Sequence, residues 1–402
     1  MIRSSKLSIK FANTGKKNDV FLFIEEYKKV TSFFIDLLWE QDEIPNLLPK
    51  DVTDQAETWL SKRAIQCAAK QASGIARGAI KKNKQRLFVY NKLLEQRLFI
   101  KARKLKKIID KHTSSKPDIK HLNPELDSRF IHFDFENNTF FDGWLTLSSL
   151  GNKLKIQIPV KKTKHFNSLS GKLKSGIRLN KKHVTLMFES DVKTRNKGKT
   201  LGLDIGINAV ATTSDGQFKE SDCDEWTFNK IIQRLNKKKK GSKGYAKVQR
   251  QRTNFINWNI NQLNLSKVKV LKLEDIKHVR RGRRTSKYLS HWTYAEIKGK
   301  LEQTCENLGV QVEYVSPTYT SQRCNSCGWV RRSNRQNQEF KCSQCGHATN
   351  ADLNAARNIA TNLRAISNKE RLLHKNRIGF YWNEVGQECI VPVAKKYATC
   401  LW

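Results

Sequence analysis

The sequence predicts a multidomain α+β protein: a small β-barrel interrupted by a helical bundle, followed by an α/β domain with a small metal-binding insertion. Two changes in hydrophobic pattern and one cysteine motif predict this order. The pattern has a helical period up to about residue 111, a period of two over 129–189, and alternating strands and helices from residue 200. Four cysteines then interrupt the α/β part with the spacing C-x2-C-x14-C-x2-C.

The N-terminal half combines one early strand, a block of helices and a run of strands. Leu7, Ile9 and Phe11 alternate with polar residues over 6–11, as in a half-buried strand. Helices are predicted over 20–40, 54–80 and 85–111, and further strands over 129–135, 139–147, 153–160 and 183–189. Strands without helices between them favour a small antiparallel barrel, which the first strand would complete. The predicted domains are therefore 1–18 and 116–198 for the barrel and 19–115 for the helical insertion.

The C-terminal half, 199–402, is predicted to be an α/β domain. Expected strands lie at 200–205, 209–213, 268–273 and 310–315, a basic helical region at 229–263, and further helices at 291–308 and from about 351. The helical region is interrupted by KKKKGSKG, and Gly309 is expected to end the helix before it. A strand hairpin followed by alternating helices and strands fits an RNase H-like sheet.

Three carboxylates stand at the ends of separate predicted elements. Asp204 lies in LGLDIG, Glu274 ends the apolar run VKVLKL, and Asp352 opens a helix. Each alone would more often be a cap or a surface charge. Together they can converge and hold two Mg2+ ions about 3.5–4 Å apart, as in a metal-dependent nuclease. The glycines around Asp204, Gly202 and Gly206, predict open space above the sheet for a phosphodiester backbone.

The four spaced cysteines predict a structural zinc site. Cys324, Cys327, Cys342 and Cys345 form two C-x2-C pairs, each followed by glycine, in an insertion expected at 318–349. Four sulfur ligands close the coordination sphere, so the zinc would be structural. A redox dithiol would need a thioredoxin-like context that is absent. The other cysteines are expected to be packing residues or free thiols: Cys67, Cys223, Cys305, Cys389 and Cys400.

The charge of the chain predicts a nucleic-acid partner. There are 76 Lys and Arg residues against 37 Asp and Glu, a formal charge of +39. The residues predicted to contact nucleic acid are Lys101, Arg103, Lys104 and Lys107, then Lys237, Lys238, Lys239 and Lys240, then Arg331, Arg332 and Arg335 between the cysteine pairs. The alternative for each group is a solvated charged face. No apolar run is long enough to span a bilayer, so a soluble, cytoplasmic protein without a membrane partner is expected.

With these motifs identified, residues 200–366 resemble the nuclease domain of the TnpB family, transposon-associated RNA-guided DNA nucleases related to the miniature type V CRISPR effectors. The matching motifs are LGLDIGINAVATTSDG, VLKLEDI, TSQ-x-C-x2-C-G and D-x-N-A-A-x-N-I, in family order. The resemblance implies a single RuvC site formed by Asp204, Glu274 and Asp352, with Mg2+, plus a zinc ribbon. Asn350 stands where the family often has Asp.

The resemblance also implies the partners and leaves some alternatives open. It implies a guide RNA and double-stranded target DNA with a short flanking motif, held by wedge and recognition domains in the N-terminal half. The alternatives are a compact CRISPR effector of the same mechanism and a guided DNA-binding repressor without cleavage, which would be expected to lose triad acids. A junction resolvase would be much shorter. A prokaryotic, nucleoid-associated protein is expected, either as monomer or as homodimer.

Overall fold

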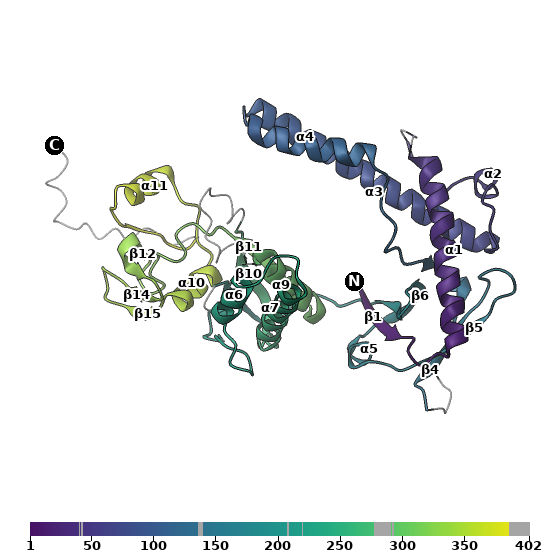
Figure 1. The fold of residues 1–402 in the computed structure, drawn as a ribbon. Coiled ribbons are helices and arrows are strands. Elements are labelled where there is room, and N and C mark those ends of the chain that lie inside the picture. Colours follow the sequence, from purple (N-terminus) through teal and green to yellow (C-terminus); the bar gives the residue numbers. More distant parts are fainter. Residues whose placement is uncertain are drawn as a thin grey trace. The chain divides into compact units, whose positions relative to one another are not determined.

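The computed structural model describes residues 1–39, 41, 43–135, 140–206, 209–218, 220–276, 291 and 293–385 (Figure 1). The chain forms two compact units, Met1–Asp191 and Val192–Trp402. Both mix helices and strands, so the α+β multidomain class is confirmed. In the part of the chain that is described, no helix is long and apolar enough to cross a membrane.

The helices of the first unit are α1 (Thr14–Leu38), α2 (Lys50–Thr53), α3 (Lys62–Glu95), α4 (Phe99–Ser114) and α5 (Lys164–Ser168). The α1 helix begins where the Asn13 side chain accepts a hydrogen bond from the Lys16 backbone at 2.9 Å. Along α3, fully buried alanines recur every four residues at Ala64, Ala68, Ala72 and Ala76, which lets α1 pack closely against it.

The predicted boundary between the second and third helices is wrong. The α3 helix continues through residues 81–84 to Glu95, and the break comes at 96–98, where Arg97 adopts a left-handed φ of 55°. Lys, Asn and Gln are tolerated inside a helix, so the polar run KKNKQ does not end it. The actual break contains neither glycine nor proline.

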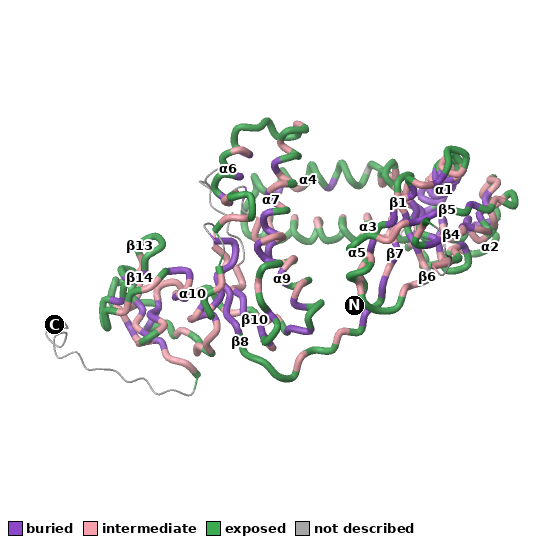
Figure 2. Tube along the Cα trace, turned by 90° about the horizontal axis from the view of Figure 1, so that it is seen from below, coloured by how far each residue is buried: buried purple, intermediate pink, exposed green. Residues whose placement is uncertain are grey.

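The strands of the first unit form two sheets. They are β1 (Ile2–Ser8), β2 (Glu125–Leu126), β3 (Ile131–Asp134), β4 (Gly143–Leu147), β5 (Ile156–Val160), β6 (Lys172–Leu179) and β7 (His183–Glu189). The orders are β1-β7-β6-β2 and β3-β4-β5. The β1 strand pairs antiparallel with β7 across the whole helical segment. Both sheets share one apolar core with α1 and α3 (Figure 2). The closed barrel stays a prediction.

The central sheet of the second unit has the order β11-β10-β8-β9. Its strands are β8 (Lys199–Asp204), β9 (Thr212–Thr213), β10 (Val268–Glu274) and β11 (Gln311–Val315). The β10 strand is parallel to β8 and β11, and β9 is antiparallel to β8. Leucines on one face of β8 and β10 share a core with α6 (Phe228–Asn236), α7 (Lys243–Asn261) and α9 (Tyr294–Leu308). Gly309 ends α9 with a φ of 69°, as predicted.

The opposite face of this sheet is covered by α10 (Ala351–Ala360), which contacts β8, β9 and β10. Before α10 lie the short elements of the cysteine-rich segment: β12 (Trp329–Val330), the 3-10 turn Arg332–Asn334, β13 (Arg335–Gln336), β14 (Glu339–Lys341) and β15 (Ala348–Asn350). After it come α11 (Asn368–Lys375) and β16 (Phe380–Tyr381). Because β16 pairs with β12, the chain after α10 returns to the cysteine-rich segment.

Candidate active site and cysteine cluster

The three predicted carboxylates converge at one end of the central sheet. Register pairs Leu203 with Leu273, so Asp204 and Glu274 follow at equivalent ends of two neighbouring parallel strands. Asp352 comes from the first turn of α10 on the covered face. A Cβ built on Gly206 would lie 3.3 Å from Oδ2 of Asp352, which locates this carboxylate beside the chain just after Asp204.

The α10 helix reaches this position because Gly202 has no side chain. A Cβ there would lie 2.1 Å from the Ala356 carbonyl oxygen and 2.4 Å from the Ala360 backbone nitrogen. The expectation of open space above Gly202 is therefore wrong, because the backbone of α10 fills it. The glycine serves helix–sheet packing, and that packing carries Asp352 to the sheet end.

Asn350 sets the start of α10. Its Oδ1 accepts hydrogen bonds from the backbone nitrogens of Asp352 at 2.9 Å and Leu353 at 3.1 Å. An Asn at this N-cap position satisfies two otherwise unpaired helix donors without adding a charge. The departure from the family pattern therefore leaves the helix start intact.

Burial and mutual repulsion shape the electrostatics of the site. Burial raises the pKa of Asp204 well above its ordinary value, and the neighbouring Glu274 and Asp352 charges raise it further, while Arg335 acts in the opposite direction. Burial also raises the pKa of Glu274, against a hydrogen bond donated by the Thr320 hydroxyl and the charge of Arg335. Three carboxylates held together in this way need compensating positive charge.

Arg335 supplies part of that charge in the structure. Its Nη2 lies 3.0 Å from Oδ1 of Asp352, and the Asp352 side chain is only 10% exposed. The predicted basic tip is therefore wrong for Arg335, because the β13–β14 hairpin lies against the start of α10 and turns this side chain toward the acids. Arg331 and Arg332 are exposed. The sequence offered no signal that separates the three arginines.

Two further residues near Glu274 were not predicted. Thr320, which is 2% exposed, donates to the Glu274 carboxylate, and the Tyr294 hydroxyl donates to the Glu274 backbone carbonyl. These bonds come from the segment before the first cysteine pair and from the start of α9. They fix the end of β10 from two sides.

The four cysteines form a compact cluster. Their sulfurs all lie within 4.8 Å of one another, with 3.8 Å between Cys324 and Cys345 and 3.6 Å between Cys327 and Cys342. A tetrahedron with Zn–S bonds of about 2.3 Å has edges of about 3.8 Å, so the sulfur set fits one zinc ion. Among the described residues, no other set of three or more His, Cys, Asp or Glu ligand atoms is this compact.

Buried polar side chains connect the cysteine cluster to α10. Asn358 donates to the backbone carbonyls of Thr320 and Arg323, at 2.8 and 2.7 Å, and accepts from Arg323 Nη1 at 2.7 Å. Asn354 donates to the Arg323 carbonyl at 2.8 Å and accepts from the Asn325 backbone at 3.0 Å. The two asparagines of the D-x-N-A-A-x-N motif thus join the first cysteine pair to the helix that carries Asp352.

The segment after α10 completes this module. Arg323 Nε donates to the Trp382 carbonyl at 2.7 Å, and Val330, Phe380 and Trp382 form a small core. The packed unit around the cysteines is therefore larger than the predicted 318–349. Cys389 and Cys400 lie outside the described residues.

The other predicted nucleic-acid-binding residues lie on exposed surfaces. Lys101, Arg103, Lys104 and Lys107 are exposed on α4 in the first unit. Lys237, Lys238, Lys239 and Lys240 are exposed between α6 and α7 in the second. The structure brings neither group to the three carboxylates within its own unit.

Known proteins match this chain mainly in its second unit. Residues 294–359 match the family model described as Cas12f1-like, TNB domain. Over 91 residues the chain is 43% identical to the CRISPR-associated endodeoxyribonuclease Cas12f1 of Sulfoacidibacillus thermotolerans, covering 22% of this chain and 21% of that protein. It is 30% identical over 211 residues to InsQ of Escherichia coli (strain K12), which is named a putative RNA-guided DNA endonuclease, covering 44% and 52%.

A solved structure shares the fold more widely. The mini-RNA-guided endonuclease CRISPR-Cas_phi3 aligns with a TM-score of 0.51 at 12% identity, over 90% of this chain and 92% of that one. The chain spans about a fifth of the length of the Cas12f1 relative and about half of InsQ. A TnpB-like protein of Aquifex aeolicus (strain VF5) is 28% identical over 81 residues, 19% of this chain and 26% of that protein. This chain is therefore related to the TnpB-like and Cas12f1 proteins.

Proposed function

We propose that this protein is an RNA-guided, Mg2+-dependent DNA endonuclease with a single RuvC-type active site. The observation that carries the proposal is the convergence of Asp204, Glu274 and Asp352 at one sheet end, next to a cysteine cluster that matches the Cas12f1-like family. The strand order, an antiparallel partner beside three parallel strands, supports an RNase H-like domain.

The carboxylates fit hard divalent cations, because oxygen ligands are what Mg2+ prefers. Two bound Mg2+ ions would supply charge that activates water and stabilises the leaving oxygen of the phosphodiester. In this proposal the side chains have separate tasks. Asp204 and Glu274 present negative charge from rigid strand ends, Thr320 orients the Glu274 carboxylate, and Asp352 closes the set from α10.

The four sulfurs support one structural Zn2+ in the same unit. Its task in this proposal is to hold the segment that presents Thr320 and Arg335 to the acids. The exposed basic residues of α4 and of 237–240 support binding to the phosphates of the guide RNA and the target DNA. Sequence recognition would then reside in base pairing.

A compact type V CRISPR effector is a second candidate, supported by the 43% identity to a Cas12f1. Its site chemistry would be the same, so the source of the guide RNA separates the two. A guided repressor is disfavoured because all three acids are present.

The test is cleavage of a labelled DNA duplex by the purified protein–RNA complex. RNA that copurifies with the protein is sequenced, and its guide portion is matched to one duplex and mismatched to another. Cleavage of the matched duplex alone, dependent on Mg2+ and abolished by a chelator, is expected. Cleavage independent of the guide would contradict the proposal.

A further inference from the structure

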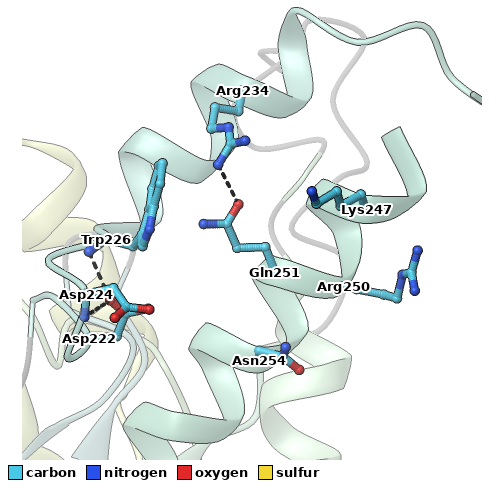
Figure 3. Close-up of a pocket in the computed structure, with 8 residues that line it drawn as sticks. All are labelled: Asp222, Asp224, Trp226, Arg234, Lys247, Arg250, Gln251 and Asn254. Carbon is cyan, nitrogen blue, oxygen red and sulfur yellow. Dashed lines mark hydrogen bonds between the residues drawn. The ribbon is translucent and has the colours of Figure 1, made fainter. Parts of the chain in front are cut away.

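A pocket on the second unit lies apart from the three carboxylates. It is formed by α6, α7 and the turn before α6, and its volume is about 630 Å3 (Figure 3). Its lining includes Trp226, Arg234, Lys247, Arg250, Gln251 and Asn254. None of the predicted catalytic or zinc-binding residues lines this pocket.

One face of α7 supplies half of the lining. Lys247, Gln251 and Asn254 are spaced by four and three residues, so they follow one side of the helix, and Arg250 stands beside them. The buried residues of α7 are a different set that includes Val248, Phe255 and Ile256. The polar face is therefore not needed for the core of the unit.

The opposite side of the pocket presents flat groups. The guanidinium of Arg234 lies 4.8 Å from the centre of the Trp226 ring, and Arg234 Nη1 donates to Gln251 at 2.9 Å (Figure 3). This bond connects α6 to α7 across the pocket. Stacked guanidinium and indole groups are a common surface for the face of a nucleobase.

The turn that carries Trp226 is held in place. The carboxylate of Asp222 accepts hydrogen bonds from the backbone nitrogens of Trp226 at 2.9 Å and Asp224 at 3.1 Å. The Asp222 backbone nitrogen donates to the Trp226 carbonyl at 3.1 Å. Because Asp222 is engaged with its own turn, it fixes the indole, whereas Asp224 is exposed at the pocket edge.

We infer that this pocket binds one unpaired nucleotide of a nucleic-acid strand, with the base on Trp226 and Arg234 and the backbone along Lys247 and Arg250. The amides of Gln251 and Asn254 and the Asp224 carboxylate would meet the base edge. Lys247 and Arg250 are exposed, so both can reach phosphate. This inference rests on the proposed nucleic-acid function and adds a site for an unpaired segment of the guide or of displaced DNA.

A mixed lining favours a nucleotide over other ligands. A simple anion would not need the indole ring, and an apolar ligand would not match the cations and amides. Paired bases cannot expose their faces, so the site selects an unpaired segment. The lysine run 237–240 joins α6 to α7 and can hold the neighbouring backbone.

The test compares Trp226→Ala with wild type in full-length protein without divalent ions. The probes are a fluorescent 12-nucleotide single strand, as RNA and as DNA, and the duplex of the same sequence. Removing the stacking partner of one base should weaken single-strand binding by about 5- to 150-fold and leave duplex binding unchanged. Whichever of RNA or DNA shows the larger decrease identifies the strand.

Two further variants keep the test decisive. Trp226→Phe retains a ring and should bind the single strand nearly as wild type does, which separates stacking from a folding defect. Lys247→Ala with Arg250→Ala should lower the salt dependence of single-strand binding by about 0.7 log units per phosphate, whereas Lys267→Ala, at an exposed position outside the pocket, serves as control. An equal decrease for single strand and duplex in Trp226→Ala, or no decrease, would overturn the inference.

The result is independent of the nuclease proposal. If Trp226→Ala has no selective effect while guided, Mg2+-dependent cleavage is present, only the pocket inference fails. If the selective effect is found but no guided cleavage occurs, only the nuclease proposal fails.

Discussion

The two candidate metal centres of the second unit differ in how complete they are. The four cysteine sulfurs lie within 4.8 Å of one another, at spacings that suit a single zinc ion. The carboxylates are less compact and already use other partners: Arg335 pairs with Asp352, and Thr320 bonds Glu274. The cysteine cluster is geometrically closed, whereas the acidic site retains room and charge for further cations.

This difference indicates a division of labour. A closed centre can hold a segment rigid, and an open one can exchange ligands. The two are joined through Asn354, Asn358 and Arg323, so the rigidity of the first can position the second. Substitutions at each centre and at the bonds between them can separate the two roles.

The largest effect is expected from removing a zinc ligand. Cys324→Ser should lose zinc and unfold the cysteine-rich segment, because metal binding provides about 10–16 kcal/mol in small zinc modules. Elemental analysis and limited proteolysis check this. Cys223→Ser, an exposed cysteine outside the cluster, is the matched control and should keep its zinc. A wild-type protein without zinc would contradict the assignment.

Breaking the connection should give the next largest effect. Asn358→Ala leaves the buried partners on Thr320 and Arg323 unsatisfied, which costs about 1–3 kcal/mol per group. We expect a lower melting temperature and slower cleavage with zinc content unchanged, measured on the same preparation. Asn368→Ala, at an exposed site, is the control for stability. Unchanged cleavage in Asn358→Ala would mean that the two centres act independently.

Arg335 tests how the acidic site is balanced without metal. Arg335→Ala removes the cation that pairs with Asp352, which should destabilise the metal-free protein by about 1–3 kcal/mol. Added Mg2+ should then raise the melting temperature more in the variant than in wild type, because no side chain competes for Asp352. Arg332→Ala, at an exposed position, should behave as wild type. An equal Mg2+ increment in all three proteins would refute this role.

The α4 surface should affect neither centre. Neutralising Lys101, Arg103, Lys104 and Lys107 together should reduce the log–log salt slope of RNA binding by about 0.7–0.9 for each phosphate that these side chains neutralise in wild type. Zinc content and Mg2+ stabilisation should stay at wild-type values. A salt slope that does not change would assign this helix to solvent.

Much of the second unit could be predicted because its patterns are local. Cysteine spacing brought four sulfurs together, apolar runs marked β8 and β10, and acids at their ends converged. The predictions that failed depended on tertiary packing. Nothing in the sequence shows that Gly202 lies against the α10 backbone or that Arg335 turns inward while Arg331 does not.

The first unit was harder to predict from the sequence. Its helix break at 96–98 has no glycine or proline to mark it, and β6, KLKSGIRL, mixes lysine, serine and glycine instead of alternating. The β6 strand forms because it pairs with β7 on one side and with β2 on the other. Pairing of this kind between separate segments is not encoded in a local period.

The central claim is tested most directly by guided DNA cleavage with single substitutions of the three acids. Asp204→Ala, Glu274→Ala and Asp352→Ala should each reduce cleavage by more than the roughly 10–100-fold that removal of an outer partner costs, while binding of guide and target persists. Asp275→Ala beside Glu274 is the control and should still cut. Cleavage by Asp204→Ala at the wild-type rate would contradict the account.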